Sequence, residues 1–137
     1  MKIVVIDGQG GRMGSLLMEK LKKAPLPEAE IHAVGTNSTA TAAMMKAGAD
    51  YGATGENPVL VACRDADYII GPLGILAADS LLGEVTPSMA VAIGRSRAQK
   101  ILLPVNRCNH HVVGVQNYSL SALTEQAISD LLTCIQG

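Results

Sequence analysis

The sequence has no tryptophan and no phenylalanine, and it has only three tyrosines among 137 residues, although 48% of its residues are hydrophobic. Its core must therefore be built from aliphatic side chains, methionine and alanine. A chain of this length corresponds to one domain, because a cofactor domain and a separate substrate domain together need more residues. We expect a single domain over residues 1–137.

Charge of one sign is also lacking, since eleven basic and twelve acidic residues give a formal net charge of −1. Without a basic stripe, nothing favours nucleic acid or an anionic membrane as a partner. No apolar run has the length of a membrane span, and the N-terminal run is too short for a signal peptide. Cys63, Cys108 and Cys134 are odd in number and lack metal-ligand spacing. We therefore expect a cytoplasmic protein with reduced thiols, no metal, and no nucleic-acid or membrane partner.

A positive mean hydropathy, +0.27, is high for a short chain. It indicates that part of the apolar surface is covered by another copy, because small α/β proteins commonly associate. We expect a homo-oligomer, most simply a dimer.

Strand and helix signals alternate along the chain. Apolar, β-branched runs bounded by glycine or proline predict strands at residues 2–6, 30–34, 68–71, 100–105 and, at a sheet edge, 112–115. Amphipathic or capped segments predict helices at residues 13–23, 39–47, 75–82, 86–98 and 119–132. Residues 49–58 indicate a loop, and residues 59–63 fit either a strand or a short helix. This alternation predicts an α/β, Rossmann-like fold, a mostly parallel sheet with helices on both faces.

A glycine-rich loop joins the first strand to the first helix, with the sequence Gly8-Gln9-Gly10-Gly11-Arg12-Met13-Gly14. Gly8 permits a tight turn, Gly10 lets the backbone approach a phosphate, and Gly14 lets the helix pack closely. The N–H groups and the positive dipole end at the helix start favour an anion. We predict a site for a phosphate-bearing nucleotide or dinucleotide. The spacing is one residue longer than the commonest fingerprint, and a glycine-rich turn without a ligand is the alternative.

That string resembles the N-terminal loop of dihydrodipicolinate reductases, which use NADH or NADPH. The resemblance implies that residues 10–14 cradle a pyrophosphate and that Arg12 lies near the adenosine end. It covers only this loop and the following helix. The reductases' substrate-binding domain and catalytic histidine motif have no counterpart here, so that activity is not implied.

The end of the second predicted strand lacks the acidic residue that binds the ribose 2′-hydroxyl in NAD-type sites. The sequence there is Gly35-Thr36-Asn37-Ser38. The hydroxyl and amide groups of Thr36, Asn37 and Ser38, together with Arg12, favour a 2′-phosphate and hence NADP over NAD as cofactor. Capping of the next helix by Ser38 or Thr39 explains these residues equally well.

Other candidate site residues follow from the rule that ligands bind beyond the carboxyl ends of the strands. Gly71, Asn106 and Arg107 are predicted ligand contacts, and Arg107 could pair with a phosphate in bidentate fashion. The candidates for catalysis are Cys108, as a thiolate, and His110 or Asp50, as acid or base. Each has a structural alternative, such as a packed thiol, a solvated histidine or an ordinary connecting loop.

Two functions fit these residues. The first is a nucleotide-binding protein, including a small NAD(P)-dependent oxidoreductase completed at a subunit interface. The second is a non-catalytic sensor or regulatory module for a phosphorylated metabolite, which the lack of a clear proton-transfer pair favours. A sugar-phosphate lyase or isomerase using Asp50 or His110 is a third hypothesis, so whether the chain is an enzyme stays open.

Further motifs extend over nearly the whole chain, namely Ile6-Asp7-Gly8-Gln9-Gly10-Gly11, Gly35-Thr36-Asn37-Ser38, Gly52-Ala53-Thr54-Gly55-Glu56-Asn57, Ile70-Gly71-Pro72, Gly83-Glu84-Val85-Thr86-Pro87 and Leu103-Pro104-Val105-Asn106-Arg107-Cys108-Asn109. Through them the chain resembles a bacterial family of short Rossmann-like proteins known as a domain of unknown function. The resemblance implies the fold and assigns no reaction.

Overall fold

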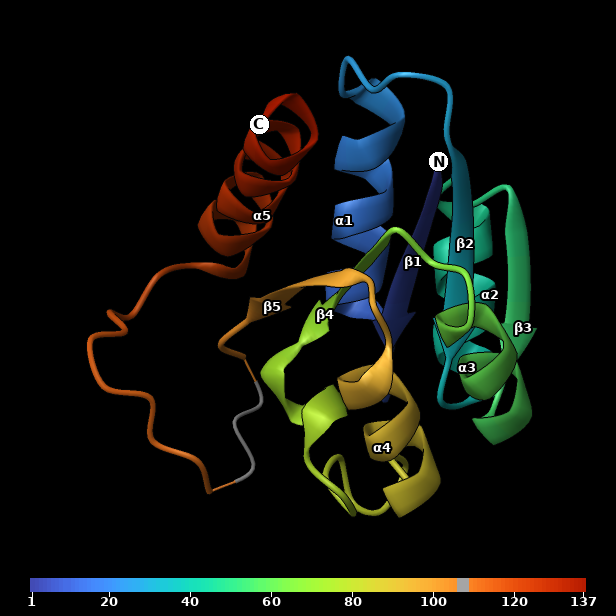
Figure 1. Ribbon diagram of the computed structural model, residues 1–137. Coiled ribbons are helices and arrows are strands. Elements are labelled where there is room, and N and C mark those ends of the chain that lie inside the picture. The colour runs from blue at the N-terminus through green and yellow to red at the C-terminus, as the bar shows by residue number, and fades with distance from the viewer. Residues whose placement is uncertain (106–108) are drawn as a thin grey trace.

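The computed structural model describes residues 1–105 and 109–137, and a five-stranded parallel sheet lies at its centre (Figure 1). The strand order is β3-β2-β1-β4-β5, and every neighbouring pair is parallel. The strands are β1 (Lys2–Asp7), β2 (Glu30–Gly35), β3 (Tyr51–Thr54), β4 (Tyr68–Pro72) and β5 (Gln99–Leu103). This is the Rossmann strand order 3-2-1-4-5-6 without its sixth strand, so the predicted fold class is confirmed.

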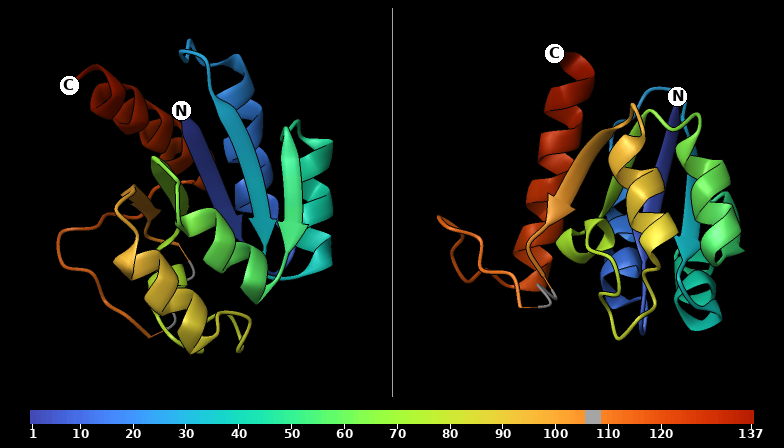
Figure 2. Two further views of the ribbon diagram at one scale, coloured as in Figure 1. Left: turned by 45° about the vertical axis from the view of Figure 1, so that its right-hand side comes forward. Right: turned by 60° about the horizontal axis from the view of Figure 1, so that its bottom comes forward.

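Helices cover both faces of the sheet (Figure 2). They are α1 (Arg12–Lys23), α2 (Ser38–Lys46), α3 (Glu56–Cys63), α4 (Pro87–Arg95) and α5 (Leu120–Gln136), with a short 3₁₀ helix, η1 (Leu73–Leu76). One core packs α1, α2 and α5 on the sheet, and the other packs α3, η1 and α4 on the opposite face.

Strand β1 shows why an aliphatic core suffices. Ile3 and Val5 belong to the core on the α1 face, whereas Val4 and Ile6 belong to the core on the α3 face. Side chains of one strand alternate between faces, so a β-branched run fills both layers. The buried residues of the two cores are aliphatic, methionine and alanine, apart from Cys63, as the composition predicts.

The connections create a crevice at the carboxyl ends of β1 and β4. From β1 the chain runs outward through β2 to β3, and it then returns to β4 on the other side of β1. The connections that leave β1 and β4 therefore diverge, which is where ligands bind in open α/β sheets. The glycine-rich loop lies at this position.

Two helices begin at a capping side chain. The Thr86 hydroxyl accepts a hydrogen bond from the Met89 N–H, 3.2 Å, and Pro87 follows as the first residue of α4. The Ser119 hydroxyl accepts from the Ala122 N–H, 3.1 Å, at the start of α5.

The prediction of a loop at residues 49–58 is wrong, because β3 and the start of α3 lie there. Strand β3 pairs with β2 in parallel, with Gly52 opposite Ala33. Its sequence contains glycine and alanine and has weak strand propensity, so the pairing with β2 decides its structure. Residues 59–63, which fit two structures, are helical within α3.

The prediction of a helix at residues 75–82 is also wrong. After η1 the chain turns irregularly, with positive φ at Asp79 (66°), Leu81 (55°) and Leu82 (56°). The Ser80 hydroxyl donates to the Gly74 carbonyl, and the Asp79 N–H donates to the Val85 carbonyl, 2.7 Å. These turn bonds replace the helical ladder, and the chain from residue 77 to residue 86 forms what we call the η1–α4 connection.

The predicted edge strand at residues 112–115 is absent as well. The Val115 N–H donates to the Val112 carbonyl, and Gly114 has φ of 86°, so these residues form a turn. The segment from residue 109 to residue 119 runs away from the sheet in both figures, and it has no strand beside it to pair with. None of the helices in the described part of the chain is both long and apolar enough to cross a membrane.

Leu82 leads to a stability prediction. Its side chain is 98% exposed and its backbone has φ of 56°, a conformation that disfavours residues with a Cβ. We expect Leu82→Gly to raise the unfolding free energy by about 0.5–1 kcal/mol in urea titrations, because relief of strain exceeds the entropy cost. Val113 is 88% exposed without a positive φ. Val113→Gly should therefore give no gain, and equal effects would contradict the strain argument.

Candidate functional site

The glycine-rich loop begins at the end of β1 and ends at the N-terminus of α1. Gly11 precedes the helix with φ of 73°, and its N–H donates to the Gly8 carbonyl, 3.0 Å. An added Cβ at Gly11 would lie 2.8 Å from the Ala40 Cα of α2. Glycine is needed there both for the left-handed conformation and for the close approach of α2.

The Asp7 carboxylate accepts hydrogen bonds from N–H groups at both ends of the loop. Its Oδ1 accepts from the Gly8 N–H, 2.8 Å, and its Oδ2 accepts from the Gly14 N–H, 2.7 Å. The side chain is buried, and burial raises the pKa of Asp7, while the hydrogen bonds from Gly14 and Gly8 lower it in part and the charge of Glu84 raises it further. The first turn of α1 is thus capped by a carboxylate from the preceding strand.

Three backbone N–H groups of the loop have no partner in the described part of the chain, namely those of Gly10, Arg12 and Met13. They belong to the loop and the first turn of α1, where the helix dipole favours negative charge. A cavity of about 310 Å³ lies against this loop, and Val105 and Leu120 also line it. The arrangement can bind an anion such as a phosphate through backbone donors.

The other glycines of the loop differ in role. An added Cβ at Gly14 would lie 2.5 Å from the Met44 Sδ of α2, so Gly14 permits close packing, here against α2. At Gly10 an added Cβ would meet nothing within 4 Å. Gly10 therefore faces open space, which is what a ligand needs in order to approach the backbone there.

Sequence reasoning missed Glu84, which lies in the η1–α4 connection and reaches the loop from there. Its Oε1 accepts three hydrogen bonds, from the Gln9 N–H (2.8 Å), the Thr36 hydroxyl (2.6 Å) and the Asn37 Nδ2 (3.1 Å). Partial burial raises the pKa of Glu84, but these three hydrogen bonds outweigh it, and the pKa is lowered. The carboxylate that the end of β2 lacks in sequence is thus supplied from a distant segment.

The predicted 2′-phosphate donors at the end of β2 are therefore already engaged. Thr36 and Asn37 donate to Glu84, and the Asn37 Oδ1 accepts from the Ala40 N–H, 2.8 Å. Asn37, rather than Ser38 or Thr39, is the N-cap of α2, and Ser38 is its first helical residue. This geometry weighs against the hypothesis that these side chains hold a 2′-phosphate.

Gly71 is brought close to the loop's strand but does not line the cavity. It is buried in β4, and an added Cβ would lie 2.5 Å from the Ile6 carbonyl oxygen. Its observed contacts are those of a packing residue. Asn106, Arg107 and Cys108 lie outside the described residues, and His110 is exposed in the segment after them.

Asp50 lies at the opposite end of the sheet, where β3 begins. Its Oδ2 accepts from the Ile31 N–H, 2.9 Å, and its Oδ1 lies 3.3 Å from the Lys22 Nζ. The hydrogen bond from Ile31 is the main cause that lowers the pKa of Asp50 below 3.8. Asp50 therefore joins β2 to β3 and is remote from the cavity at the glycine-rich loop.

Asp50 also gives a pH prediction. A carboxyl whose pKa is lowered on folding stabilises the protein above its unfolded pKa, near 3.8, and loses this effect as the pH falls through the folded value. We expect wild type to exceed Asp50→Asn in unfolding free energy at pH 7 by less than about 1 kcal/mol, because the group is exposed. Urea titrations should show that the difference in unfolding free energy disappears once the pH is below the folded pKa of Asp50. A difference independent of pH would contradict the assignment.

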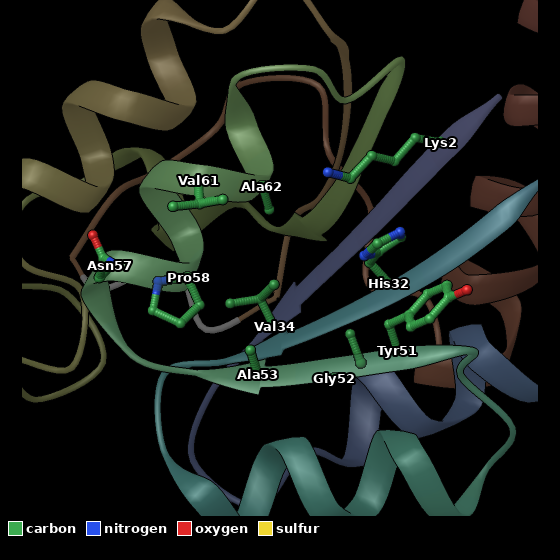
Figure 3. Close-up of a pocket in the computed structure, with 11 residues that line it drawn as sticks. Lys2, His32, Val34, Tyr51, Gly52, Ala53, Asn57, Pro58, Val61 and Ala62 are labelled. Carbon is green, nitrogen blue, oxygen red and sulfur yellow. The ribbon is translucent and has the colours of Figure 1, made fainter.

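A second cavity, of about 380 Å³, lies on the α3 face of β2 and β3 (Figure 3). The rings of His32 and Tyr51 contact each other at one end, with centroids 4.9 Å apart and planes tilted by 33°, and Asn57 and Pro58 lie at the other. Small apolar residues such as Val34 and Ala62 line the space between them. It shares no lining residue with the first cavity, and its ionisable groups, Lys2, His32 and Tyr51, lie at one end.

Within residues 1–105 and 109–137, no group of three or more histidine, cysteine, aspartate or glutamate side chains is arranged to hold a metal ion. The free thiols described are Cys63, which is buried, and Cys134, which is exposed. Burial raises the pKa of the Cys63 thiol, which makes it less reactive.

Comparison with known proteins shows the family. The model of the family described as "Domain of unknown function (DUF3842)" matches residues 2–136, and the chain belongs to this family. No curated protein matches the sequence significantly. Among solved structures, the chain is similar to a dodecameric FMN-dependent UbiX-like decarboxylase from Escherichia coli O157:H7, with 18% identity and a TM-score of 0.48, over 96% of this chain and 76% of that one.

Proposed function

We propose that this member of the family binds a nucleotide through the loop from Gly8 to Gly14, with a phosphate on the N–H groups of Gly10, Arg12 and Met13. The observation that carries the proposal is that these three donors are unpaired at the N-terminus of α1, beside a cavity at the switch point of the sheet. The first N–H groups of a helix have no partner within the helix, and those of Gly10, Arg12 and Met13 line a cavity together, so this position suits an anionic ligand.

A dinucleotide of the NAD type fits the surroundings of the loop. In this strand order the adenosine half lies toward the end of β2 and the other half crosses toward β4 and β5. Thr36, Asn37 and Glu84 provide polar groups on the first side, and Val105 provides an apolar wall on the second. The cavity of about 310 Å³ has room for a phosphate and part of a sugar.

The described lining of the cavity favours binding without proton transfer. Asp7 is its only carboxylate, and both Asp7 oxygens accept hydrogen bonds from the backbone. Arg12 is the only other ionisable side chain there, and a guanidinium does not release its proton. A sensor or regulatory module is therefore favoured over an oxidoreductase in which this part of the chain acts alone.

Calorimetric titration with NAD⁺, NADP⁺, ADP, CoA and FMN tests the proposal. We expect an adenine nucleotide to bind with a dissociation constant in the micromolar range, and no binding by any of the five would overturn the proposal. FMN is included because it contains phosphate but no adenosine.

A substitution at Gly10 gives a sharper test. Because nothing lies within 4 Å of an added Cβ, Gly10→Val should fold with nearly unchanged stability. The branched side chain would occupy the space that a phosphate approaches, so nucleotide affinity should fall at least about tenfold. Gly94→Ala, also in open space but in α4, is the matched control and should bind as wild type does. Unchanged affinity of Gly10→Val would contradict the assignment of the loop.

We also propose that the chain forms a homo-oligomer, most simply a dimer. Tyr51 is 55% exposed and Val61 is 44% exposed, and both line the second cavity beside the unpaired edge of β3. Exposed apolar residues grouped in this way are typical of interfaces. Native mass spectrometry at micromolar concentration should show the dimer, and a monomeric mass would contradict it.

A further inference from the structure

The carboxylate of Glu84 lies at the place where an NAD-type site needs an acid. In such sites an Asp or Glu at the end of the second strand accepts a hydrogen bond from the ribose 2′-hydroxyl, beside the glycine-rich loop. Here Glu84 contacts the loop at the Gln9 N–H, 2.8 Å, and the end of β2 at the Thr36 hydroxyl, 2.6 Å. The group is present in the fold although it is absent from the local sequence.

We propose that Glu84 recognises the ribose of the bound nucleotide and makes the site selective for a free 2′-hydroxyl over a 2′-phosphate. This inference rests on the proposed function, because it places the adenosine end of the same ligand. It replaces the expectation from sequence that the end of β2 favours NADP.

The two oxygens of Glu84 differ in a way that suits this role. Oε1 accepts all three hydrogen bonds from Gln9, Thr36 and Asn37, whereas Oε2 accepts none in the part of the chain that the structure describes. Glu84 is partly exposed, so Oε2 is not enclosed. A hydroxyl group can donate to Oε2 without breaking a bond that holds the carboxylate.

A 2′-phosphate would meet the opposite conditions. A 2′-phosphate carries a charge of about −2, and it would lie next to the negatively charged carboxylate of Glu84. Like charges placed together at a binding site oppose binding strongly. Of the groups that could compensate, Thr36 and Asn37 already donate to Glu84, and Arg12 lines the cavity in which the proposed phosphate on the loop binds. Lys46, the nearest cation after them in sequence, lies at the far end of α2.

The carboxylate is held in place before any ligand arrives. Leu81 and Val85, on either side of it in the η1–α4 connection, are buried in the core on the α3 face. An added Cβ at Gly8 would lie 2.7 Å from the Glu84 Oε1, so the connection rests directly on the loop. A group fixed in this way loses little entropy when it binds, which increases its contribution to selectivity.

Ligands that differ only at the 2′-position test the proposal on the wild-type protein. Calorimetric titrations with NAD⁺, NADP⁺ and 2′-deoxy-NAD⁺ should show NADP⁺ weaker than NAD⁺ by about tenfold or more. The deoxy analogue should be weaker than NAD⁺ by about threefold to tenfold, because it lacks one hydrogen bond to a charged group. Binding of NADP⁺ as tight as that of NAD⁺ would overturn this inference alone, whereas binding of none of the three would overturn the proposed function with it.

A charge substitution connects the selectivity to Glu84. Glu84→Gln keeps the shape and one acceptor oxygen but removes the charge, so the NAD⁺ to NADP⁺ affinity ratio should fall to within about threefold of unity. Glu56→Gln is the matched control, because Glu56 accepts from the Thr86 hydroxyl, 2.6 Å, near the same connection and carries the same charge. It should retain the wild-type ratio, and an equal change in both variants would show a nonspecific charge effect and refute the role of Glu84. If Glu84→Gln does not fold, the ligand series on wild type decides.

Discussion

Replacing Gly71 with alanine should lower the unfolding free energy by about 3 kcal/mol, because β1 and β4 have no space for a side chain at this position. The added Cβ would lie 2.5 Å from the Ile6 carbonyl oxygen and 2.9 Å from the Ile75 Cδ1. The first of these contacts is with backbone in the centre of the sheet, so neither strand can move without loss of ladder hydrogen bonds. The melting temperature should fall by roughly 10 °C for a chain of this size.

Gly94→Ala should change the unfolding free energy in the opposite direction. An added Cβ at Gly94 meets nothing within 4 Å, and the residue lies within α4. Alanine has the higher helix propensity, so urea unfolding should show a gain of about 0.5–1 kcal/mol. If Gly71→Ala were instead as stable as wild type and lost nucleotide binding, the ligand contact predicted for Gly71 from sequence would regain support over the packing role.

The parts of the fold that local chemistry specifies could be predicted from sequence. The β-branched run of β1, the apolar stripe of α1 and the Thr86-Pro87 start of α4 each identify their own element. Strand β3 could not be predicted in this way, because Tyr51-Gly52-Ala53-Thr54 forms a strand only by pairing with β2. The helix predicted at residues 75–82 is wrong for a similar reason. The apolar residues of the η1–α4 connection pack into the core from an irregular turn and do not form one face of a helix.

For the candidate site too, one part could be predicted from local sequence and another part only from the fold. The loop from Gly8 to Gly14 can be recognised in the sequence because its glycines lie close together between a strand and a helix. Glu84 is separated from Thr36 by 48 positions in the chain, so only the fold brings the two together. The one signal in the sequence was an acid missing from the end of β2, and that signal does not say which other acid takes its place.

Two carboxylates accept hydrogen bonds from three of the seven N–H groups from Gly8 to Gly14. Asp7 accepts from Gly8 and Gly14, Glu84 accepts from Gln9, and Gly11 bonds within the turn. The remaining three donors belong to Gly10, in the loop, and to Arg12 and Met13, the first two residues of α1. The internal acids therefore fix the loop and leave one defined set of donors for an external anion, instead of filling the whole loop with negative charge.

Loss of the Asp7 carboxylate should consequently have the second large effect. Asp7→Ala removes the acceptor for two N–H groups, at Gly8 and Gly14, on a buried side chain. Removing the sole partner of a buried donor costs more than the bond contributes, and the relief of burying a charge offsets only part of this. We expect the unfolding free energy at pH 7 to fall by about 2–3 kcal/mol in urea titrations, with nucleotide binding weakened as the start of α1 frays.

The pH dependence of this difference identifies the cause. Burial raises the pKa of Asp7 above 3.8, so the folded protein binds the proton more tightly than the unfolded chain does. The stabilisation from Asp7 is then fully present below the unfolded pKa and decreases as the pH rises through the folded value. The gap between wild type and Asp7→Ala should therefore widen as the pH falls from 7 toward 4. Asp65→Ala, which removes an exposed acid paired with Lys2, is the control and should leave the urea midpoint nearly unchanged at pH 7. A gap that narrows toward pH 4 would mean that the hydrogen bonds from Gly8 and Gly14 outweigh burial and that Asp7 is held as a stable anion.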